Sequence, residues 1–294
     1  MGSSLPVPAT SDGRAGLDAI LAAPHRAVVA LDFDGTLAPI VSDPEQARPH
    51  PEVLPALARL APALGALAVV TGRSARTAVR YGGFAGVPGL ERLTVLGAYG
   101  AERWSAATGR FEAPPPPPGV AAVRAELPRL LAESGAPDGV WTEDKGRAVA
   151  VHTRRAADPA ATLALLRAPL TELAEQHQLR VEPGRMVLEL RPPGMDKGAA
   201  LLAFLREVGA GEGAPPPDRP GAFPAAPPVL YAGDDLGDLA AFAAVRERRA
   251  EGGPGLLVCS GSAEVTELAD RADLVVDGPP GVARLLGALA TALS

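Results

Sequence analysis

AVVALDFDGTL, at residues 27–37, is the most informative stretch of this chain. Its five apolar residues, 27–31, predict a buried strand, and the acidic pair Asp32 and Asp34 follows that strand directly. In an open α/β sheet, ligands bind just beyond the carboxyl ends of the strands, which is where these two carboxylates fall. Residues two apart in an extended segment point the same way, so one carboxylate can attack a substrate while the other handles a proton. The alternative is an ordinary strand-to-turn junction, because Asp-Gly is a common turn dipeptide.

Short apolar runs recur along the chain and alternate with stretches of helical periodicity. The predicted strands occupy residues 27–31, 66–70, 93–96, 228–232, 256–259 and 272–276. The predicted helices occupy about residues 51–64, 73–81, 196–208, 236–249, 262–269 and 279–292. This alternation is typical of βαβ units, so we expect an α/β fold with a Rossmann-like parallel sheet of six strands.

Residues 114–193 interrupt that alternation. The region begins with five prolines at 114–118 and ends at Arg-Pro-Pro-Gly, residues 191–194, and both stretches are typical of linkers. Between them the pattern predicts helix 119–133, strand 139–143, a turn at 144–146, strand 147–153, helix 158–177, strand 179–182, a turn at 183–184 and strand 186–190. We therefore expect an αββαββ domain, 114–193, inserted into a core of residues 25–113 and 194–294. Residues 1–24 would be an N-terminal extension that need not be ordered.

A second acidic group follows another predicted strand, in GDDLGD at residues 233–238. Converging carboxylates repel one another unless a cation lies between them, and hard oxygen ligands beside a phosphate suit Mg²⁺. We expect Asp32, the backbone carbonyl of Asp34, and Asp234 to form such a site. Capping of the next helix by Asp235 is an alternative that is compatible with metal binding.

Two further segments are suited to hold a phosphate group. Thr71-Gly72-Arg73-Ser74 follows strand 66–70 and begins a helix, so it offers a hydroxyl and backbone N–H groups to an anion, and we expect Arg73 to contact the substrate. Lys197 begins another predicted helix, where its compact charge can neutralise a transferring phosphoryl group. The alternatives are a cap for Thr71 and a solvated first-turn position for Lys197.

In this order, DFDGTL, the Thr of VVTGR, the Lys of MDKG and GDDLGD resemble the motifs of the haloacid-dehalogenase-like (HAD) phosphohydrolases. The resemblance implies that Asp32 is a nucleophile that forms an aspartyl-phosphate and that Asp34 is the general acid and base. It implies that Thr71 and Lys197 hold the phosphoryl group. Asp234 would hold Mg²⁺, with Asp235 as a supporting ligand, and the choice between Asp235 and Asp238 as a direct ligand stays open. The αββαββ insertion resembles the C2-type cap of that superfamily.

Within the superfamily, residues 25–292 resemble the trehalose-6-phosphate phosphatases. The resemblance rests on LGAYGAER (96–103), DKGRAVAVHTR (144–154) and PGRMVLELRPPGMDKGAAL (183–201). The chain departs from the family pattern at Tyr99, where His is usual, and at Leu239, where the D-x-x-x-D-E pattern has Glu. The resemblance implies Mg²⁺-dependent hydrolysis of trehalose 6-phosphate to trehalose and phosphate, and a functional link to a trehalose-phosphate synthase.

The two predicted hairpins of the insertion carry polar groups suited to a sugar. A carboxylate facing a phosphate pocket is repulsive, but it can accept bidentate hydrogen bonds from neighbouring sugar hydroxyls, so Glu189 favours a sugar phosphate. A solvated position on an edge strand is the alternative for Glu189. The resemblance implies that the glucosyl unit remote from the phosphate is contacted by Lys145, Arg185 and Glu189, with Glu102 or Arg103 nearby.

Composition excludes several other classes of protein. A chain of 294 residues with 47% hydrophobic and 21% charged residues is typical of globular proteins. The net charge of −6 and the absence of a basic run exclude a general nucleic-acid binder. A single cysteine, Cys259, excludes an intrachain disulfide framework, and neither a secretory leader nor an apolar run of membrane-spanning length is apparent. We expect a cytoplasmic protein without a membrane partner.

Two other functions fit the same motifs. A HAD phosphatase acting on a sucrose-phosphate or mannosylglycerate-phosphate type of ester would differ only in the cap. A non-catalytic sugar-phosphate sensor should have lost one of the acidic residues, whereas Asp32, Asp34 and Asp234 are all present.

Overall fold

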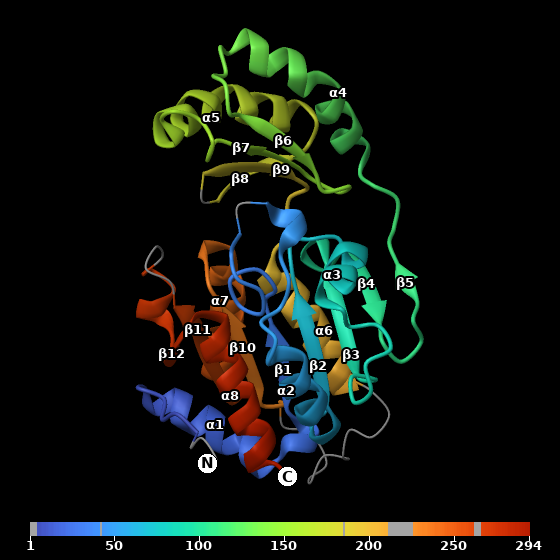
Figure 1. Cartoon of the computed structure of the whole chain (residues 1–294), viewed down its shortest axis with the longest axis vertical. Helices are drawn as coiled ribbons and strands as arrows, with labels where there is room; N and C mark the ends of the chain where they lie inside the picture. The colour runs from blue at the N-terminus through green and yellow to red at the C-terminus, as the bar shows by residue number, and fades with distance from the viewer. Residues whose placement is uncertain (1–4, 42, 185, 211–225, 262–265) are drawn as a thin grey trace. The chain divides into compact units, whose positions relative to one another are not determined.

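The chain folds into two compact units. A computed structural model describes residues 5–41, 43–184, 186–210, 226–261 and 266–294. The core unit comprises Met1–Glu112 and Asp196–Ser294, and the inserted unit comprises Ala113–Met195 (Figure 1).

The core unit contains, in the described part of the chain, an eight-stranded sheet of order β12-β11-β10-β1-β2-β3-β4-β5. The six predicted strands are confirmed and run parallel: β1 (Val28–Leu31), β2 (Ala66–Val70), β3 (Leu93–Gly97), β10 (Val229–Gly233), β11 (Gly255–Gly261) and β12 (Leu274–Asp277). The count of six was wrong, because β4 (Glu102–Ser105) and β5 (Phe111–Glu112) extend the sheet in antiparallel fashion. Neither has an apolar run, since Trp104 alone is buried within Glu-Arg-Trp-Ser.

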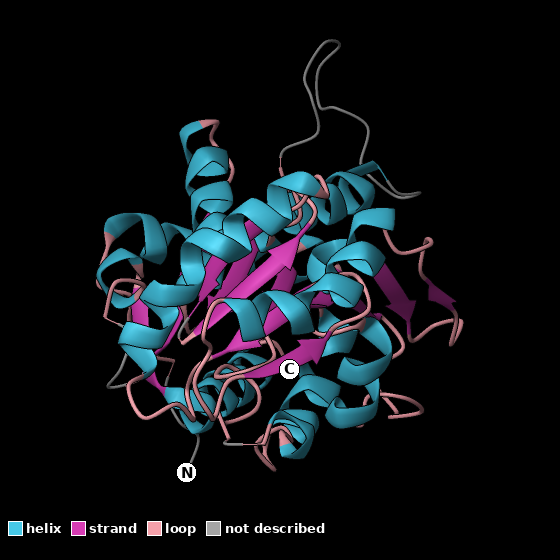
Figure 2. Ribbon diagram, turned by 90° about the horizontal axis from the view of Figure 1, so that it is seen from above, coloured by secondary structure: helices cyan, strands magenta, loops and turns pink. Residues whose placement is uncertain are grey.

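Helices cover both faces of this sheet. In Figure 2 the strands are the magenta arrows, and helices lie on either side of them. Alternate residues of β1 belong to two apolar clusters, one on each face of the sheet. Val29 and Leu31 pack with residues of α1, α2 and α8, whereas Val28 and Ala30 pack with residues of α6 and α7. Burial on both faces is why the parallel strands are continuous apolar runs. The helices of the core unit are α1 (Ser11–Ala22), α2 (Val53–Leu60), α3 (Ala75–Gly82), α6 (Lys197–Ala210), α7 (Leu239–Ala250) and α8 (Gly278–Ala292).

The structure differs from the sequence-based predictions at two helices. Residues 11–22 of the expected N-terminal extension form α1, which is capped by the Thr10 side chain and buries Leu17 and Ile20 in the core. The helix expected at 262–269 is wrong where the structure describes it: residues 266–268 are coil and turn, and Ala269–Arg271 form a single 3-10 turn. Residues 262–265 lie outside the described residues.

The inserted unit has the predicted αββαββ order. It contains α4 (Pro118–Glu133), β6 (Trp141–Asp144), β7 (Val149–His152), α5 (Pro159–Gln176), β8 (Arg180–Gly184) and β9 (Val187–Arg191). The strands form an antiparallel sheet of order β6-β7-β9-β8, and apolar residues of α4 and α5 pack with Val149, Val151, Leu188 and Leu190. The turn expected at 183–184 is instead the end of β8, where Pro183 and Gly184 pair with Leu188 and Val187.

Candidate active site

The first acidic pair lies at the carboxyl end of β1, as the sequence predicts. The Asp32 amide donates to the Ala232 carbonyl of neighbouring β10 at 2.9 Å, which extends the β1–β10 pairing to the first carboxylate. Gly35 then turns the chain with φ +74°. A Cβ at Gly35 would stand 1.9 Å from Oδ2 of Asp234, so only glycine lets the second acidic segment approach this closely.

Asp32 is held in a buried ion-pair network with Lys197 and Asp238. Nζ of Lys197, at the first turn of α6, lies 2.8 Å from Oδ1 of Asp32 and 2.8 Å from Oδ1 of Asp238. Burial opposes the charge of Lys197, but attraction by Asp238 and Asp32 outweighs it and holds the pKa of Lys197 well above its ordinary value. Lys197 is therefore a charged buried side chain beside the candidate nucleophile and not the solvated residue of the alternative view.

Asp238 organises this part of the site through both of its oxygens. Oδ1 accepts from Lys197 and, at 2.6 Å, from the hydroxyl of Tyr231, while Oδ2 accepts from the backbone amides of Asp234 and Asp235 at 3.0 and 3.3 Å. The Asp235 carboxylate accepts from the Gly237 amide and caps the following turn. From the sequence, Asp238 was only an alternative to Asp235 as a metal ligand and Tyr231 had no expected role, although the Asp-x-x-Asp spacing is that of a capping box.

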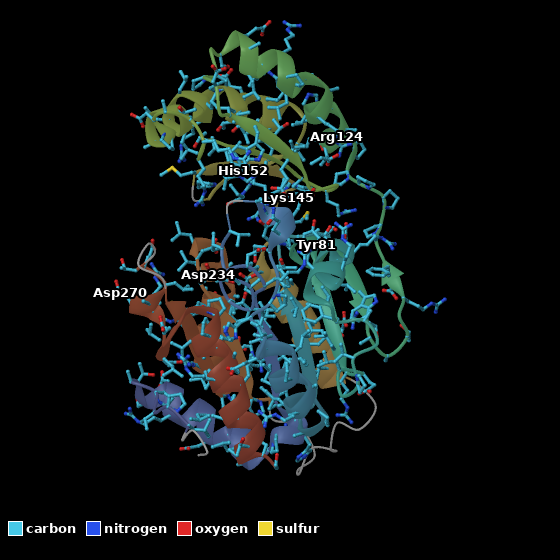
Figure 3. The ribbon with its side chains drawn as sticks, viewed as in Figure 1. Tyr81, Arg124, Lys145, His152, Asp234 and Asp270 are labelled. Atoms are coloured by element: carbon cyan, nitrogen blue, oxygen red, sulfur yellow. The ribbon has the colours of Figure 1, made fainter. Side chains whose placement is uncertain are left out.

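Three buried carboxylates converge in the described part of the core unit. Asp32, Asp234 and Asp238 each offer an oxygen within 4.8 Å of the others, and Figure 3 labels Asp234. Burial, and then repulsion by Asp32, raises the pKa of Asp234 to about 10, and burial raises the pKa of Asp32 well above 3.8 despite Lys197. One lysine does not offset this negative charge, and hard carboxylate oxygens suit a divalent cation such as Mg²⁺. Because Asp238 already accepts four hydrogen bonds, Asp32 and Asp234 have more capacity left for a cation.

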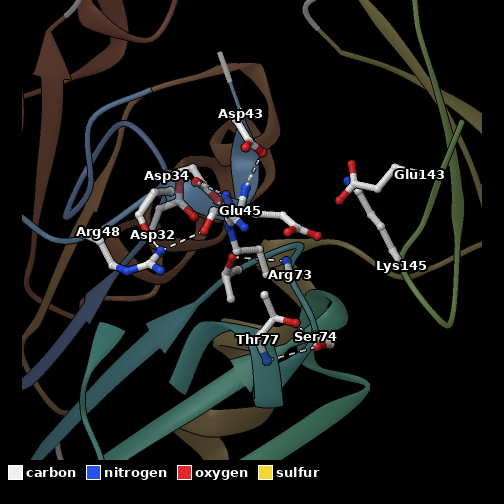
Figure 4. A network of polar contacts seen from close by, with 12 residues as sticks. Asp32, Asp34, Asp43, Glu45, Arg48, Arg73, Ser74, Thr77, Glu143 and Lys145 are labelled. Atoms are coloured by element: carbon white, nitrogen blue, oxygen red, sulfur yellow. Dashed lines mark hydrogen bonds and ion pairs between the residues drawn. The ribbon is translucent and has the colours of Figure 1, made fainter. Parts of the chain in front are cut away.

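Asp34 is not one of the three converging carboxylates and pairs with Arg73. Nε of Arg73 donates to Oδ2 of Asp34 at 2.6 Å, and a terminal nitrogen of Arg73 donates to Oδ1 at 2.7 Å (Figure 4). The side chain expected to contact the substrate therefore holds the expected general acid and base. The Asp34 backbone carbonyl, and not its carboxylate, stays the candidate metal ligand at this position.

The turn after β2 forms the third part of the site. Thr71 is buried, and its hydroxyl accepts from the Arg73 amide at 3.2 Å. Ser74 caps α3 by accepting from the Thr77 amide, and Glu102 accepts from the Ala75 amide at the same helix start. Glu102 is thus engaged in fixing the helix that carries this loop.

Comparison with known proteins identifies the family to which these features belong. A family model described as trehalose-phosphatase matches residues 30–275. The chain belongs to the trehalose-phosphatase family. Its core has the fold of the HAD-like hydrolases, and no helix among the described residues is long and apolar enough to cross a membrane.

Named relatives agree with this family assignment. The trehalose-phosphate phosphatase of Mycobacterium avium is 35% identical over 242 residues, which are 81% of this chain and 56% of that protein. The chain thus spans little more than half the length of this relative. The C-terminal domain of Candida albicans trehalose-6-phosphate phosphatase superposes with a TM-score of 0.70 at 22% identity and covers 98% of this chain and 99% of that domain. The C-terminal domain of a Candida albicans trehalose synthase regulatory protein has the same fold, with a TM-score of 0.60, 15% identity, and coverage of 90% of this chain and 93% of that domain.

Tyr99 is one of the two departures from the usual pattern of the trehalose-phosphatase family. It has left-handed backbone angles, φ 56° and ψ 37°, and its amide donates to the Thr71 carbonyl at 3.0 Å. The phenol lies against Gly72, because a Cβ there would stand 2.7 Å from the Tyr99 oxygen. Tyr99 therefore packs on the loop that carries Thr71 and Arg73.

The remaining predicted substrate residues divide between the units. Arg103 pairs with Glu207 of α6 and is engaged within the core unit. In the inserted unit, Lys145 Nζ pairs with Oε2 of Glu189, which is only 5% exposed and has an Oε1 without a hydrogen-bond partner. Glu189 is thus a buried carboxylate rather than a solvated one. Arg185 lies outside the described residues, and His152 stacks on Trp141 and contacts Glu143 at 2.9 Å.

Proposed function

We propose that this chain hydrolyses trehalose 6-phosphate to trehalose and phosphate. The observation that carries the proposal is the buried Lys197–Asp32 pair, which has Asp234 beside it at the carboxyl end of the parallel strands. The chain that carries this pair belongs to the trehalose-phosphatase family. A buried lysine beside a buried carboxylate offers a nucleophile and a cation for a phosphoryl group in one place. The substrate would come from a synthase that makes trehalose 6-phosphate.

The reaction proceeds in two steps. Asp32 attacks phosphorus, an aspartyl-phosphate bond forms, the bond from phosphorus to the sugar oxygen breaks, and Asp34 supplies the proton that the departing oxygen takes up. In the second step Asp34 accepts a proton from water as it attacks the phosphorus, and phosphate leaves with Asp32 restored. Lys197 and the Thr71 hydroxyl hold the phosphoryl oxygens in both steps.

The acidic cluster fits Mg²⁺. Asp32, Asp234 and the Asp34 carbonyl would hold the ion, with Asp235 in support and Asp238 fixing the loop. The bound ion supplies charge neutralisation for the phosphoryl group.

Substrate selection is assigned to the inserted unit as the cap. Glu189 has one oxygen on Lys145 and one without a partner among the described residues, and this free acceptor suits a sugar hydroxyl. Lys145 offers further donors, and Arg185 joins this set on the resemblance to the family.

The test is phosphate release from trehalose 6-phosphate, sucrose 6-phosphate, a mannosylglycerate phosphate and glucose 6-phosphate, with Mg²⁺ or with EDTA. We expect a preference for trehalose 6-phosphate of at least about 100-fold in kcat/KM, loss of activity in EDTA, and no turnover by Asp32→Asn. Glu189→Gln should lower the preference while activity on glucose 6-phosphate persists. A preference for another ester would contradict the proposed substrate but leave the chemistry intact.

A regulatory role is the second candidate, because a solved regulatory protein has this fold. It predicts that wild-type chain binds trehalose 6-phosphate without releasing phosphate. The presence of Asp32, Asp34, Asp234 and Lys197 favours the enzyme.

A further inference from the structure

Arg73 binds both carboxylate oxygens of Asp34. The two nitrogen–oxygen distances are 2.6 and 2.7 Å, and the side chains are 14% and 33% exposed. Bidentate arginine–carboxylate pairs fix orientation as well as supplying charge. We propose that Arg73 is a positioning residue that holds Asp34 in the free protein and moves to the phosphate group of the substrate when this binds, which releases Asp34. The inference rests on the proposed role of Asp34 in phosphate ester hydrolysis.

The surroundings of Arg73 are positively charged and aromatic. Its guanidinium lies 5.6 Å from the ring centroid of Phe33 and 5.4 Å from that of Tyr81. The guanidinium groups of Arg48 and Arg80 lie 4.6 and 4.7 Å from the same Tyr81 ring. Three like charges around one buried ring favour an anion at Arg73, and a phosphate dianion satisfies that requirement better than a single carboxylate.

The position of Arg73 in the chain allows this exchange. Its amide donates to the hydroxyl of Thr71, so Arg73 belongs to the turn expected to hold the phosphoryl group. Arginine recognises phosphate through the same parallel pair of donors that it offers to a carboxylate. Only the side chain of Arg73 has to move, because Thr71 and the start of α3 already hold its backbone.

The ion pair has a direct consequence for the reaction. While Arg73 binds both oxygens, two charge-assisted hydrogen bonds fix the Asp34 carboxylate on Arg73 and keep it from turning toward a departing sugar oxygen. At least one oxygen has to be released before Asp34 assists that departure. Binding of the phosphate group would thus switch on the group that cleaves the ester.

The kinetic test compares two leaving groups. Trehalose 6-phosphate needs assistance for its sugar oxygen, whereas 4-nitrophenyl phosphate has a good leaving group and needs little. For Arg73→Gln we expect a rise in KM of at least about 10-fold on both substrates, because a contact to the phosphate group is lost, and a fall in kcat below about 5-fold on either, because Asp34 is already released in both substrate complexes. Arg73→Lys should restore part of the KM on both substrates, since an ammonium group also binds a phosphate group, although it cannot hold the Asp34 carboxylate bidentately in the free protein.

Arg76→Gln is the matched control, because Arg76 lies on the same helix α3 with its guanidinium over Phe111 at 4.4 Å. It should leave both activities unchanged. A fall in kcat of about 100-fold that is confined to trehalose 6-phosphate would mean that Arg73 still positions Asp34 in the substrate complex, and an unchanged KM would mean that Arg73 does not bind the phosphate group; either result would overturn the exchange.

A second test needs no turnover. Thermal unfolding of the wild type, Arg73→Gln, Asp34→Asn and the double variant measures the coupling between the two side chains. In phosphate-free buffer each single variant should lower Tm by about 2–4 °C, and the double variant should lower it no further. In saturating inorganic phosphate the coupling should disappear, because Arg73 then binds the anion. Coupling unchanged by phosphate would overturn the exchange, and this result stands even if the wild type hydrolyses none of the esters and the proposed function fails.

Discussion

At the scale of single residues, the site depends on one buried aspartate that holds other site residues in place. Asp238 is fully buried, and its two oxygens join Lys197 and Tyr231 to the backbone of the Asp234 segment. It thereby fixes the charge opposite Asp32 and the loop that carries the candidate metal ligand. A neutral replacement would leave some of these buried donors without an acceptor.

Asp238→Asn should destabilise the protein by about 3–5 kcal/mol, because an amide group presents a donor either to Lys197 and Tyr231 or to the backbone amides. Unfolding in urea measures the loss. Asp270→Asn, on the exposed 3-10 turn Ala269–Arg271, is the control and should change stability by less than about 0.5 kcal/mol. A loss below about 1 kcal/mol for Asp238→Asn would show that the network is not held by this carboxylate.

At the scale of elements, α1 packs closely against the sheet at a glycine position. A Cβ at Gly16 would stand 1.9 Å from the Gly255 carbonyl oxygen of β11, so the helix packs against the strand backbone itself. Alanine favours an isolated helix over glycine by about 0.5–1 kcal/mol. Here the overlap with a strand backbone that cannot move outweighs that gain.

Gly16→Ala should therefore lower the free energy of unfolding by about 1–3 kcal/mol through displacement of α1. Asp18→Ala, at an exposed position of the same helix, should leave stability unchanged or slightly raise it. Denaturant unfolding of both variants checks this. A stabilised Gly16→Ala would mean that α1 does not pack on β11 as closely as the structure has it.

The same helix shows what the sequence can and cannot predict. The parallel strands were predicted because burial on both faces leaves apolar runs such as 66–70 in the sequence. In α1 the two glycines argue against a helix, and only close packing explains them: Gly16 lies against Gly255 of β11, and Gly13 lies against Asp273. The position of Asp32 at a strand end follows from topology, but the bidentate pair between Asp34 and Arg73 depends on side-chain packing around Tyr81, which leaves no trace in residue spacing.

At the scale of the whole molecule, the acidic cluster couples stability to pH and to cations. Asp234 has a pKa of about 10 in the folded chain against 3.8 as its ordinary value, and the pKa of Asp32 is raised in the same direction. A raised carboxyl pKa means that the folded state binds more protons than the unfolded state. The stability is then complete below pH 3.8 and is lost as the pH rises toward 10.

The metal-free protein should therefore show a Tm that falls between pH 5 and pH 9, a window in which the raised pKa of Lys197 keeps that group charged. Mg²⁺ binds the ionised carboxylates, so it should raise Tm more at pH 8.5 than at pH 5.5 and release protons as it binds. Differential scanning calorimetry with Mg²⁺ or EDTA, and titration in two buffers of different ionisation enthalpy, measure both effects. Asp234→Asn should flatten the pH dependence and remove most of the response to Mg²⁺, whereas Asp270→Asn should retain both. An equal Mg²⁺ response at the two pH values would mean that the cation does not bind at the cluster whose repulsion it is expected to relieve.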